Sequence, residues 1–282
     1  MPYTTFISVE ELSSHLQDPD WVIVDCRFSL ADPGKGRREY LTAHLPGAIY
    51  MHLDEDLSGP VIPGRTGRHP LPAVEAAAQR FSAVGIGNKT QVVAYDDAGG
   101  ALAAGRLWWM LRWLGHMAAA VLDGGWQAWC AAGLPVQSGE VVLQPSLFIP
   151  APRPELMASV EEVERIRGDP AFRLVDARTV ERYHGENETI DPVAGHIPGA
   201  ICAPYMENLG PDGRLLSVDA LRQKYTRLMA GAPPQKVVFY CGSGVTSTLN
   251  IMAMLHAGLG EARLYAGSWS EWIANPLRPA AK

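Results

Sequence analysis

The sequence lacks the features that mark several protein classes. Only four cysteines occur in 282 residues, and none forms a Cys-x-x-Cys pair or lies near another cysteine and a histidine at metal-ligand spacing. A disulfide scaffold or a zinc knuckle is therefore not expected. No apolar run approaches the ~18–20 residues of a membrane span, and residues 1–25 lack the basic and apolar regions of an export signal. We therefore expect a cytoplasmic protein that has no membrane partner, no metal and no organic cofactor.

Positive charge is also scarce. The chain has 24 Lys and Arg residues against 30 Asp and Glu residues, a formal net charge of −6. This balance argues against nucleic acid as the main partner. Hydrophobic residues make up 47% of the chain, as in an ordinary globular protein, and the length is sufficient for two domains.

One pattern occurs twice in the chain, in the same order in each half. Four pairs of segments match: 21–27 with 173–178, 43–49 with 195–201, 91–96 with 236–241, and 122–129 with 264–272. Between the copies, residues 144–154 contain four prolines and cannot form a helix. We predict a duplicated domain, with one copy at 1–140, the other at 156–282, and a linker over roughly 138–156.

Short apolar strands alternate with helical patterns in both halves. Helices are expected after the N-cap residues Ser8 and Ser159, and longer ones that stop at Gly115 and Gly258. Their expected ranges are 9–16, 160–166, 99–114 and 245–257. The pattern predicts an α/β fold in which each domain has a mainly parallel sheet flanked by helices. Ligands of such sheets bind beyond the carboxyl ends of the strands.

The two copies differ chemically at one matched position. Cys241 ends an apolar strand in the second half, whereas Asp96 ends the matching strand in the first. The small residues that follow Cys241 allow backbone N–H groups to converge on its sulfur, and a following helix would add positive potential. Both effects favour a nucleophilic thiolate or a persulfide. The first copy is predicted to be non-catalytic, and Cys26, Cys130 and Cys202 are interpreted as buried structural cysteines.

A cysteine phosphatase is the first alternative for such a loop. That chemistry uses Cys-x5-Arg, in which the arginine binds the phosphate. Here Ser247 is the sixth residue after Cys241, and residues 242–247 contain no Lys or Arg. This reading is therefore disfavoured.

These motifs together resemble the two-domain rhodanese sulfurtransferases along nearly the whole chain. Within that family, the segment Cys241-Gly-Ser-Gly-Val-Thr246 is similar to the active loop of 3-mercaptopyruvate sulfurtransferases, whereas thiosulfate-preferring members usually have a cationic loop. The resemblance implies that a Cys241 persulfide forms and pyruvate leaves. It also implies that the sulfur passes to a thiol acceptor, such as a thioredoxin-like protein or glutathione, or to cyanide.

The resemblance also implies roles for residues around Cys241. Arg182 would bind the substrate carboxylate, and Arg178 would be structural, pairing with Asp176. The second arginine that many mercaptopyruvate enzymes carry about nine residues after the first is missing from 187–191, which keeps thiosulfate as an alternative donor. The loop residues expected to hold the substrate or persulfide are Gly242, Gly244, Val245 and Thr246.

An Asp–His–Ser relay is implied as well, with Ser243, His69 and Asp54 as its members and Asp56 as an alternative to Asp54. A histidine is the natural proton carrier near neutral pH. Arg65 and Arg68, in the same Gly/Pro-rich loop as His69, would either add positive potential at the domain cleft or face solvent. His44 and His196 occupy matching positions in the two copies, although only one copy has the candidate nucleophile. We therefore predict that both histidines bond backbone carbonyls.

A third reading is a non-catalytic rhodanese-like binding or sensing module. The cysteine in an open loop of small residues argues against it. Donor preference and persulfide formation on Cys241 separate the three hypotheses.

Overall fold

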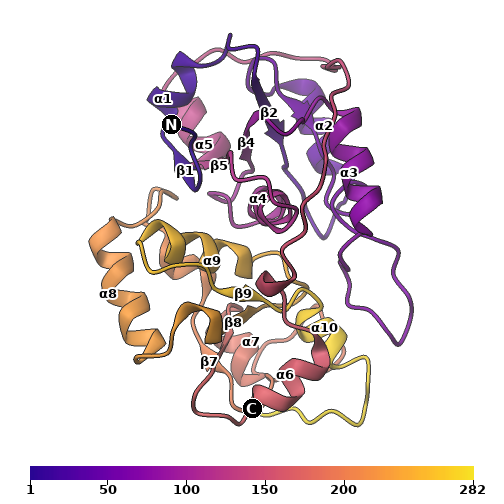
Figure 1. The fold of residues 1–282 in the computed structure, drawn as a ribbon, viewed down its shortest axis with the longest axis vertical. Coiled ribbons are helices and arrows are strands. Elements are labelled where there is room, and N and C mark those ends of the chain that lie inside the picture. The colour runs from indigo at the N-terminus through magenta and orange to yellow at the C-terminus, as the bar shows by residue number, and fades with distance from the viewer. The chain divides into compact units, whose positions relative to one another are not determined.

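The computed structural model describes all 282 residues, which divide into two compact units. Unit 1 comprises Met1–Ser58, Pro72–Arg153 and Gly210–Leu215; unit 2 comprises Gly59–Leu71, Pro154–Leu209 and Leu216–Lys282. Each unit is an α/β layer structure (Figure 1). A short piece of each half of the chain therefore belongs to the unit formed mainly by the other half.

Unit 1 has a five-stranded parallel sheet in the order β1-β5-β4-β2-β3. Its strands are β1 (Phe6–Ile7), β2 (Trp21–Asp25), β3 (Ile49–Tyr50), β4 (Gln91–Tyr95) and β5 (Ala119–Leu122). Its helices are α1 (Val9–Ser14), α2 (Lys35–Thr42), α3 (Val74–Ala83), α4 (Ala103–Trp113) and α5 (Gly125–Ala131). One face of the sheet packs on α1 and α5, and α4 contacts β4 and β5.

Unit 2 repeats this topology with the order β7-β6-β8-β9, again all parallel. Its strands are β6 (Arg173–Asp176), β7 (Ile201–Cys202), β8 (Val237–Tyr240) and β9 (Arg263–Leu264). Its helices are α6 (Val160–Ile166), α7 (Val180–His184), α8 (Val218–Met229), α9 (Ser247–His256) and α10 (Ser268–Trp272), with 3-10 turns η1 (Pro154–Leu156), η2 (Tyr205–Asn208) and η3 (Pro234–Lys236). The place of β1 is taken by a single parallel bridge between Met157 and Leu264.

The residues predicted to mark the helix ends are found at those ends. The Ser8 side chain accepts from the Glu11 N–H in a full capping box, and the Ser159 side chain accepts from the Glu162 N–H. Gly115 and Gly258 follow the C-terminal ends of α4 and α9 with positive φ. The long helices begin two to four residues later than predicted, because Gly-rich loops precede them.

The paired histidines are structural, as predicted. His44 Nδ1 lies 2.8 Å from the Tyr40 carbonyl oxygen, and its ring stacks on the Tyr40 ring. In unit 2, His196 makes the same contact with the Tyr183 carbonyl at 2.8 Å and stacks on that ring. The tryptophans Trp108, Trp109, Trp269 and Trp272 are fully buried core residues. No helix combines the length and apolar character needed to cross a bilayer.

Candidate active site

The reactive cysteine follows the central strand of unit 2. All four residues of β8 are buried, and Cys241 comes directly after them with 1% of its surface exposed. The Cys241 N–H donates to Ser268 Oγ at 3.1 Å, while the Trp269 and Ser270 N–H groups donate to the Cys241 and Gly242 carbonyls at 3.0 and 2.9 Å. The first turn of α10 therefore holds the start of the loop in place.

The loop after Cys241 requires glycine at its centre. Gly244 has φ +73°, and a Cβ there would lie 2.2 Å from the Ala266 carbonyl oxygen. Any other residue would be both strained and too close to this backbone. The tight turn carries Val245, which is buried, to the start of α9 at Ser247, with Thr246 as the N-cap residue.

This local structure stabilises the thiolate of Cys241. Burial alone would raise the pKa of the thiol, but hydrogen bonds from the Thr246 side chain and from the backbone N–H groups of Ser247 and Ser243 outweigh it, so the pKa lies below its ordinary value. The N-terminus of α9 adds positive potential at the same point. A buried thiolate with several donors is a nucleophile prepared for attack on sulfur.

Ser243 and His69 lie together, although they are far apart in the sequence. His69 Nδ1 is 2.8 Å from Ser243 Oγ, and both side chains are buried. His69 comes from the segment 59–71, which belongs to unit 2. The segment approaches α10 closely, because a Cβ on Gly67 would lie 2.4 Å from the Gly267 carbonyl oxygen. Two of the three predicted relay residues are thus brought within hydrogen-bond distance.

The third relay residue belongs to unit 1. The Asp54 N–H donates to His52 Nδ1 at 3.1 Å, and burial raises the pKa of the Asp54 carboxyl. The alternative, Asp56, accepts from the His52 N–H at 2.7 Å and pairs with Arg80. The role of Asp54 as a relay partner stays a prediction.

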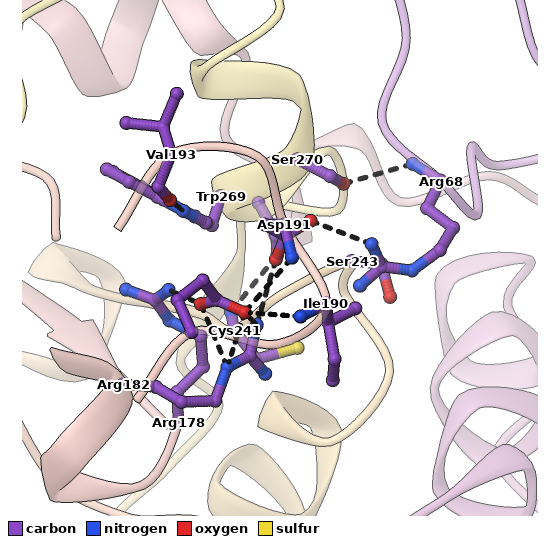
Figure 2. A network of polar contacts seen from close by, with 12 residues as sticks. Arg68, Arg178, Arg182, Ile190, Asp191, Val193, Cys241, Ser243, Trp269 and Ser270 are labelled. Atoms are coloured by element: carbon purple, nitrogen blue, oxygen red, sulfur yellow. Dashed lines mark hydrogen bonds and ion pairs between the residues drawn. The ribbon is translucent and has the colours of Figure 1, made fainter. Parts of the chain in front are cut away.

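Arg182, the predicted substrate-binding residue, lies in α7 close to the cysteine loop (Figure 2). Its Nε and Nη2 atoms donate to Glu188, and Nη2 also donates to Asp191 Oδ2 at 2.8 Å. Its Nη1 atom lies 3.6 Å from the position that a Cβ would take on Gly242. Arg178, by contrast, donates through Nε and Nη2 to the Asp176 carboxylate and through Nη2 to the Gly195 carbonyl. It therefore has the structural role predicted for it.

In unit 1, a carboxylate occupies the position that the Cys241 sulfur has in unit 2. Asp96 is fully buried at the end of β4, and its carboxylate accepts four backbone N–H groups, from Ala98, Gly100, Leu102 and Ala104, at 2.8–3.3 Å. Burial raises the pKa of Asp96 to about 6, even though these donors lower it. The loop of unit 1 therefore also surrounds an anion with backbone N–H donors, but this anion is the side chain of Asp96.

The burial predicted for the three remaining cysteines is confirmed for Cys26 only. Cys26 is fully buried, as predicted, and burial raises its pKa well above the ordinary value. Cys202 is only half-buried, and burial with nearby Asp176 raises its pKa to about 11. Cys130 is exposed, so its interpretation as a buried residue was wrong. The reason is the rotation of α5, which turns Ala128 and Trp129 toward the core and Cys130 away from it.

Sequence reasoning missed several residues of this site. Ser268, whose Oγ accepts from the Cys241 N–H, has a left-handed backbone conformation with φ +56°. No sequence motif indicates such a conformation. Glu188 and Asp191 were noted only as part of a stretch without arginine. A signal for Asp191 existed, since it lies nine residues after Arg182, where a second arginine was sought. No group of three or more His, Cys, Asp or Glu residues could hold a metal ion.

Comparison with known proteins agrees with this geometry. The model of the rhodanese-like domain matches residues 8–132 and 159–275. A relative from Pseudomonas aeruginosa, named "Probable 3-mercaptopyruvate sulfurtransferase", is 47% identical over 282 residues, covering 100% of this chain and 99% of that protein. The Arabidopsis thaliana "Thiosulfate/3-mercaptopyruvate sulfurtransferase 1, mitochondrial" is 31% identical over 298 residues, covering 97% and 77%.

Solved structures give the same result. The 3-mercaptopyruvate sulfurtransferase from Leishmania major superposes with a TM-score of 0.85 at 35% identity, covering 98% of this chain and 75% of that one. Two tandem α/β domains with a buried cysteine at a strand end, in a chain whose relatives are named sulfurtransferases, identify it as a sulfurtransferase. The chain belongs to the rhodanese family.

Proposed function

We propose that the protein takes sulfur from 3-mercaptopyruvate and transfers it through a Cys241 persulfide, releasing pyruvate. The observation that carries the choice of donor is the contact of 2.8 Å between His69 Nδ1 and Ser243 Oγ beside the thiolate. Its importance follows from the different fates of protons in the two candidate reactions.

With mercaptopyruvate, the reaction needs a proton on carbon. The Cys241 thiolate attacks the donor sulfur, an S–S bond forms, and the C–S bond breaks with its electron pair going to the carbon. The resulting enolate takes up a proton to become pyruvate, and the proton of the donor thiol is lost from the new persulfide. The net transfer is therefore one proton from sulfur to carbon. A hydroxyl hydrogen-bonded to an imidazole is suited to this transfer.

With thiosulfate, no such proton is needed. Attack on the outer sulfur breaks the S–S bond of the donor, and sulfite leaves with the electron pair as a stable anion. A buried serine–histidine pair would then have no proton to move. We infer that its presence next to Cys241 favours the keto-acid donor.

The second half of the cycle returns Cys241 to its thiolate. The outer sulfur of the persulfide passes to a thiol, giving the acceptor's persulfide, or to cyanide, giving thiocyanate. We propose glutathione, a thioredoxin-like protein or cyanide as acceptors. All four cysteines are free thiols, and we propose the cytoplasm as the compartment, since its reducing environment keeps Cys241 reactive.

The decisive test compares the two donors with one acceptor. Steady-state kcat/KM is measured for 3-mercaptopyruvate and for thiosulfate with cyanide, and intact mass is recorded after exposure to each donor. We expect a clear preference for mercaptopyruvate and a gain of about 32 Da, which Cys241→Ser abolishes. A preference for thiosulfate would refute the choice of donor, and a folded protein without any adduct would support a binding module.

The serine–histidine pair is tested in the same assay. Ser243→Ala should lower kcat for mercaptopyruvate by about 10²-fold, the usual contribution of a general acid–base group, and should change thiosulfate turnover much less. Equal losses with both donors would show that Ser243 only supports the loop. Unchanged turnover would remove it from the mechanism.

A further inference from the structure

Unit 1 lacks a loop that is present in unit 2. Each unit has a histidine whose Nδ1 atom contacts a tyrosine carbonyl, and this pair lies four residues apart in unit 1 (Tyr40 and His44) but 13 residues apart in unit 2 (Tyr183 and His196). The additional residues of unit 2 form the loop 185–194, which follows α7. Side chains that this loop contacts in unit 2 have no such covering segment in unit 1.

The loop supplies hydrogen-bond acceptors to two side chains of unit 2 (Figure 2). Arg178 Nη1 donates to Glu188 Oε2 at 3.4 Å, and Trp269 Nε1 donates to the Val193 carbonyl at 2.9 Å. The guanidinium carbon of Arg178 lies 4.9 Å from the centre of the Trp269 ring, so the two donors are neighbours. In unit 2, oxygen atoms of the chain itself therefore satisfy both donors.

Unit 1 has the same two side chains, Arg27 and Trp126. Arg27 donates through Nε and Nη2 to Asp25 and through Nη2 to the Ala43 carbonyl, which are the contacts that Arg178 makes in unit 2. Its guanidinium carbon lies 4.3 Å from the centre of the Trp126 ring. Arg27 is only 3% exposed, yet no protein atom accepts from its Nη1 atom or from Trp126 Nε1, and neither atom is fully enclosed. Both donors are therefore available to a ligand.

Both side chains line a pocket of about 420 Å³ that belongs wholly to unit 1. The pocket also has charged groups of both signs, which are the guanidinium group of Arg38 and the carboxylates of Glu39 and Asp97. Arg38 and Glu39 have partners in exposed ion pairs, whereas Asp97 pairs with no cation. The pocket therefore contains one unpartnered carboxylate in addition to the two unpartnered donors.

These groups match a ligand that carries both charges. A carboxylate would accept from Arg27 Nη1 and Trp126 Nε1, in the way that the loop oxygens do in unit 2. A neighbouring ammonium group would donate to Asp97 and would be attracted by Glu39. An anion without the ammonium group would be repelled by these two carboxylates, and a cation without the carboxylate would be repelled by the arginines.

We propose that this pocket of unit 1 binds a small α-amino acid, with its carboxylate on Arg27 and Trp126 and its ammonium group on Asp97. The site belongs to a different unit from Cys241, so its occupation does not depend on the proposed function. Unit 1, in which the Asp96 side chain occupies the position of the nucleophile, would then have a binding function of its own.

Titrations observed at Trp126 test the site directly. Protein labelled with ¹⁵N-tryptophan gives an indole N–H signal for each tryptophan, and Trp126→Phe identifies the signal of Trp126. The probes are L-alanine, propionate and ethylamine, which carry both charged groups, the carboxylate alone and the ammonium group alone. We expect L-alanine to shift the Trp126 signal saturably, propionate to bind at least about tenfold more weakly, and ethylamine to cause no shift.

Three variants assign the contacts. Asp97→Asn should weaken L-alanine binding about tenfold and leave propionate binding no weaker, since it removes only the partner of the ammonium group. Arg27→Lys keeps a charge for Asp25 but has no second donor nitrogen, so both probes should bind at least about tenfold more weakly. Arg37→Met is the matched control, because Arg37 is an exposed residue of α2 that pairs with Glu140 and does not line the pocket. It should leave both affinities within about twofold of the wild-type values.

Each outcome decides one part of the proposal. A Trp126 signal that does not move with L-alanine up to about 50 mM would overturn the site. Propionate that binds as tightly as L-alanine, or an unchanged affinity for L-alanine in Asp97→Asn, would overturn the choice of an amino acid. An unchanged affinity in folded Arg27→Lys would overturn the role of Arg27.

Urea unfolding checks the fold of every variant, and the matched probes with Asp97→Asn test the site even if Arg27→Lys does not fold. Cys241→Ser should bind L-alanine as the wild type does. Failure of the sulfur-donor assay and failure of this titration are therefore separate results.

Discussion

The buried carboxylate of Asp96 should make the stability of unit 1 depend on pH. Two opposing effects act on it: burial, which disfavours the charged form, and four backbone N–H donors, which favour it. Burial prevails and raises the pKa from the ordinary 3.8 to about 6. The folded state thus binds this proton more tightly than the unfolded state does. The associated stability is fully present below about pH 4 and is lost as pH rises through 6.

The magnitude follows from the size of this pKa difference. Integrated from pH 4.5 to 7.5, the shift corresponds to a loss of about 2 kcal/mol in the free energy of unfolding. Asp96→Asn removes the titrating group and retains an amide oxygen as an acceptor. We expect the stability of the wild type relative to Asp96→Asn to fall by this amount over the range, measured by urea unfolding at several pH values.

The comparison has a control and a clear refutation. Asp97→Asn changes the neighbouring, half-buried carboxylate and should give no such trend. A difference between wild type and Asp96→Asn that is constant with pH would refute the raised pKa. A difference that grows with pH would show that the N–H donors prevail over burial and that the pKa is lowered.

Three further predictions concern the cysteines and their loop. Thr246→Val removes a hydrogen bond to the Cys241 sulfur, so the apparent pKa for alkylation of Cys241 by iodoacetamide should rise, and an unchanged profile would contradict the donor role. Gly244→Ala should cost about 1–3 kcal/mol in the free energy of unfolding and at least tenfold in persulfide formation, because of the positive φ and the Ala266 carbonyl; a fully active variant would disprove this constraint. Cys202→Ser and Cys130→Ser should each retain most of the turnover, and a large loss in either would show that Cys241 does not act alone.

The repeated pattern was sufficient to predict the parallel sheets, because local signals agree with the fold at each level. Ser8, Ser159 and the glycines after α4 and α9 mark helix ends through backbone chemistry that depends on near neighbours only. The position of Cys241 at the end of β8 was predictable for the same reason, since strand ends of parallel sheets carry the site.

The remainder of the site depends on contacts between distant segments. Arg68 and Asp191 are 123 residues apart, and no local pattern indicates that they meet. The exposure of Cys130 depends on the rotation of a short helix about its axis, which Trp129 determines by packing into the core. The strained backbone of Ser268 likewise follows from its contact with the Cys241 N–H rather than from its own sequence.

The exchange of segments between the two halves of the chain has a consequence for any attempt to produce the two copies separately. A fragment beginning at Pro154 would contain the reactive cysteine but neither His69 nor Arg68, which residues 59–71 supply. The second half of the chain in turn supplies residues 210–215 to unit 1, where the Leu215 N–H donates to Asp123 Oδ1 at 2.7 Å. A cut at the linker would therefore divide both units, and neither half of the chain on its own would contain all the residues of its unit.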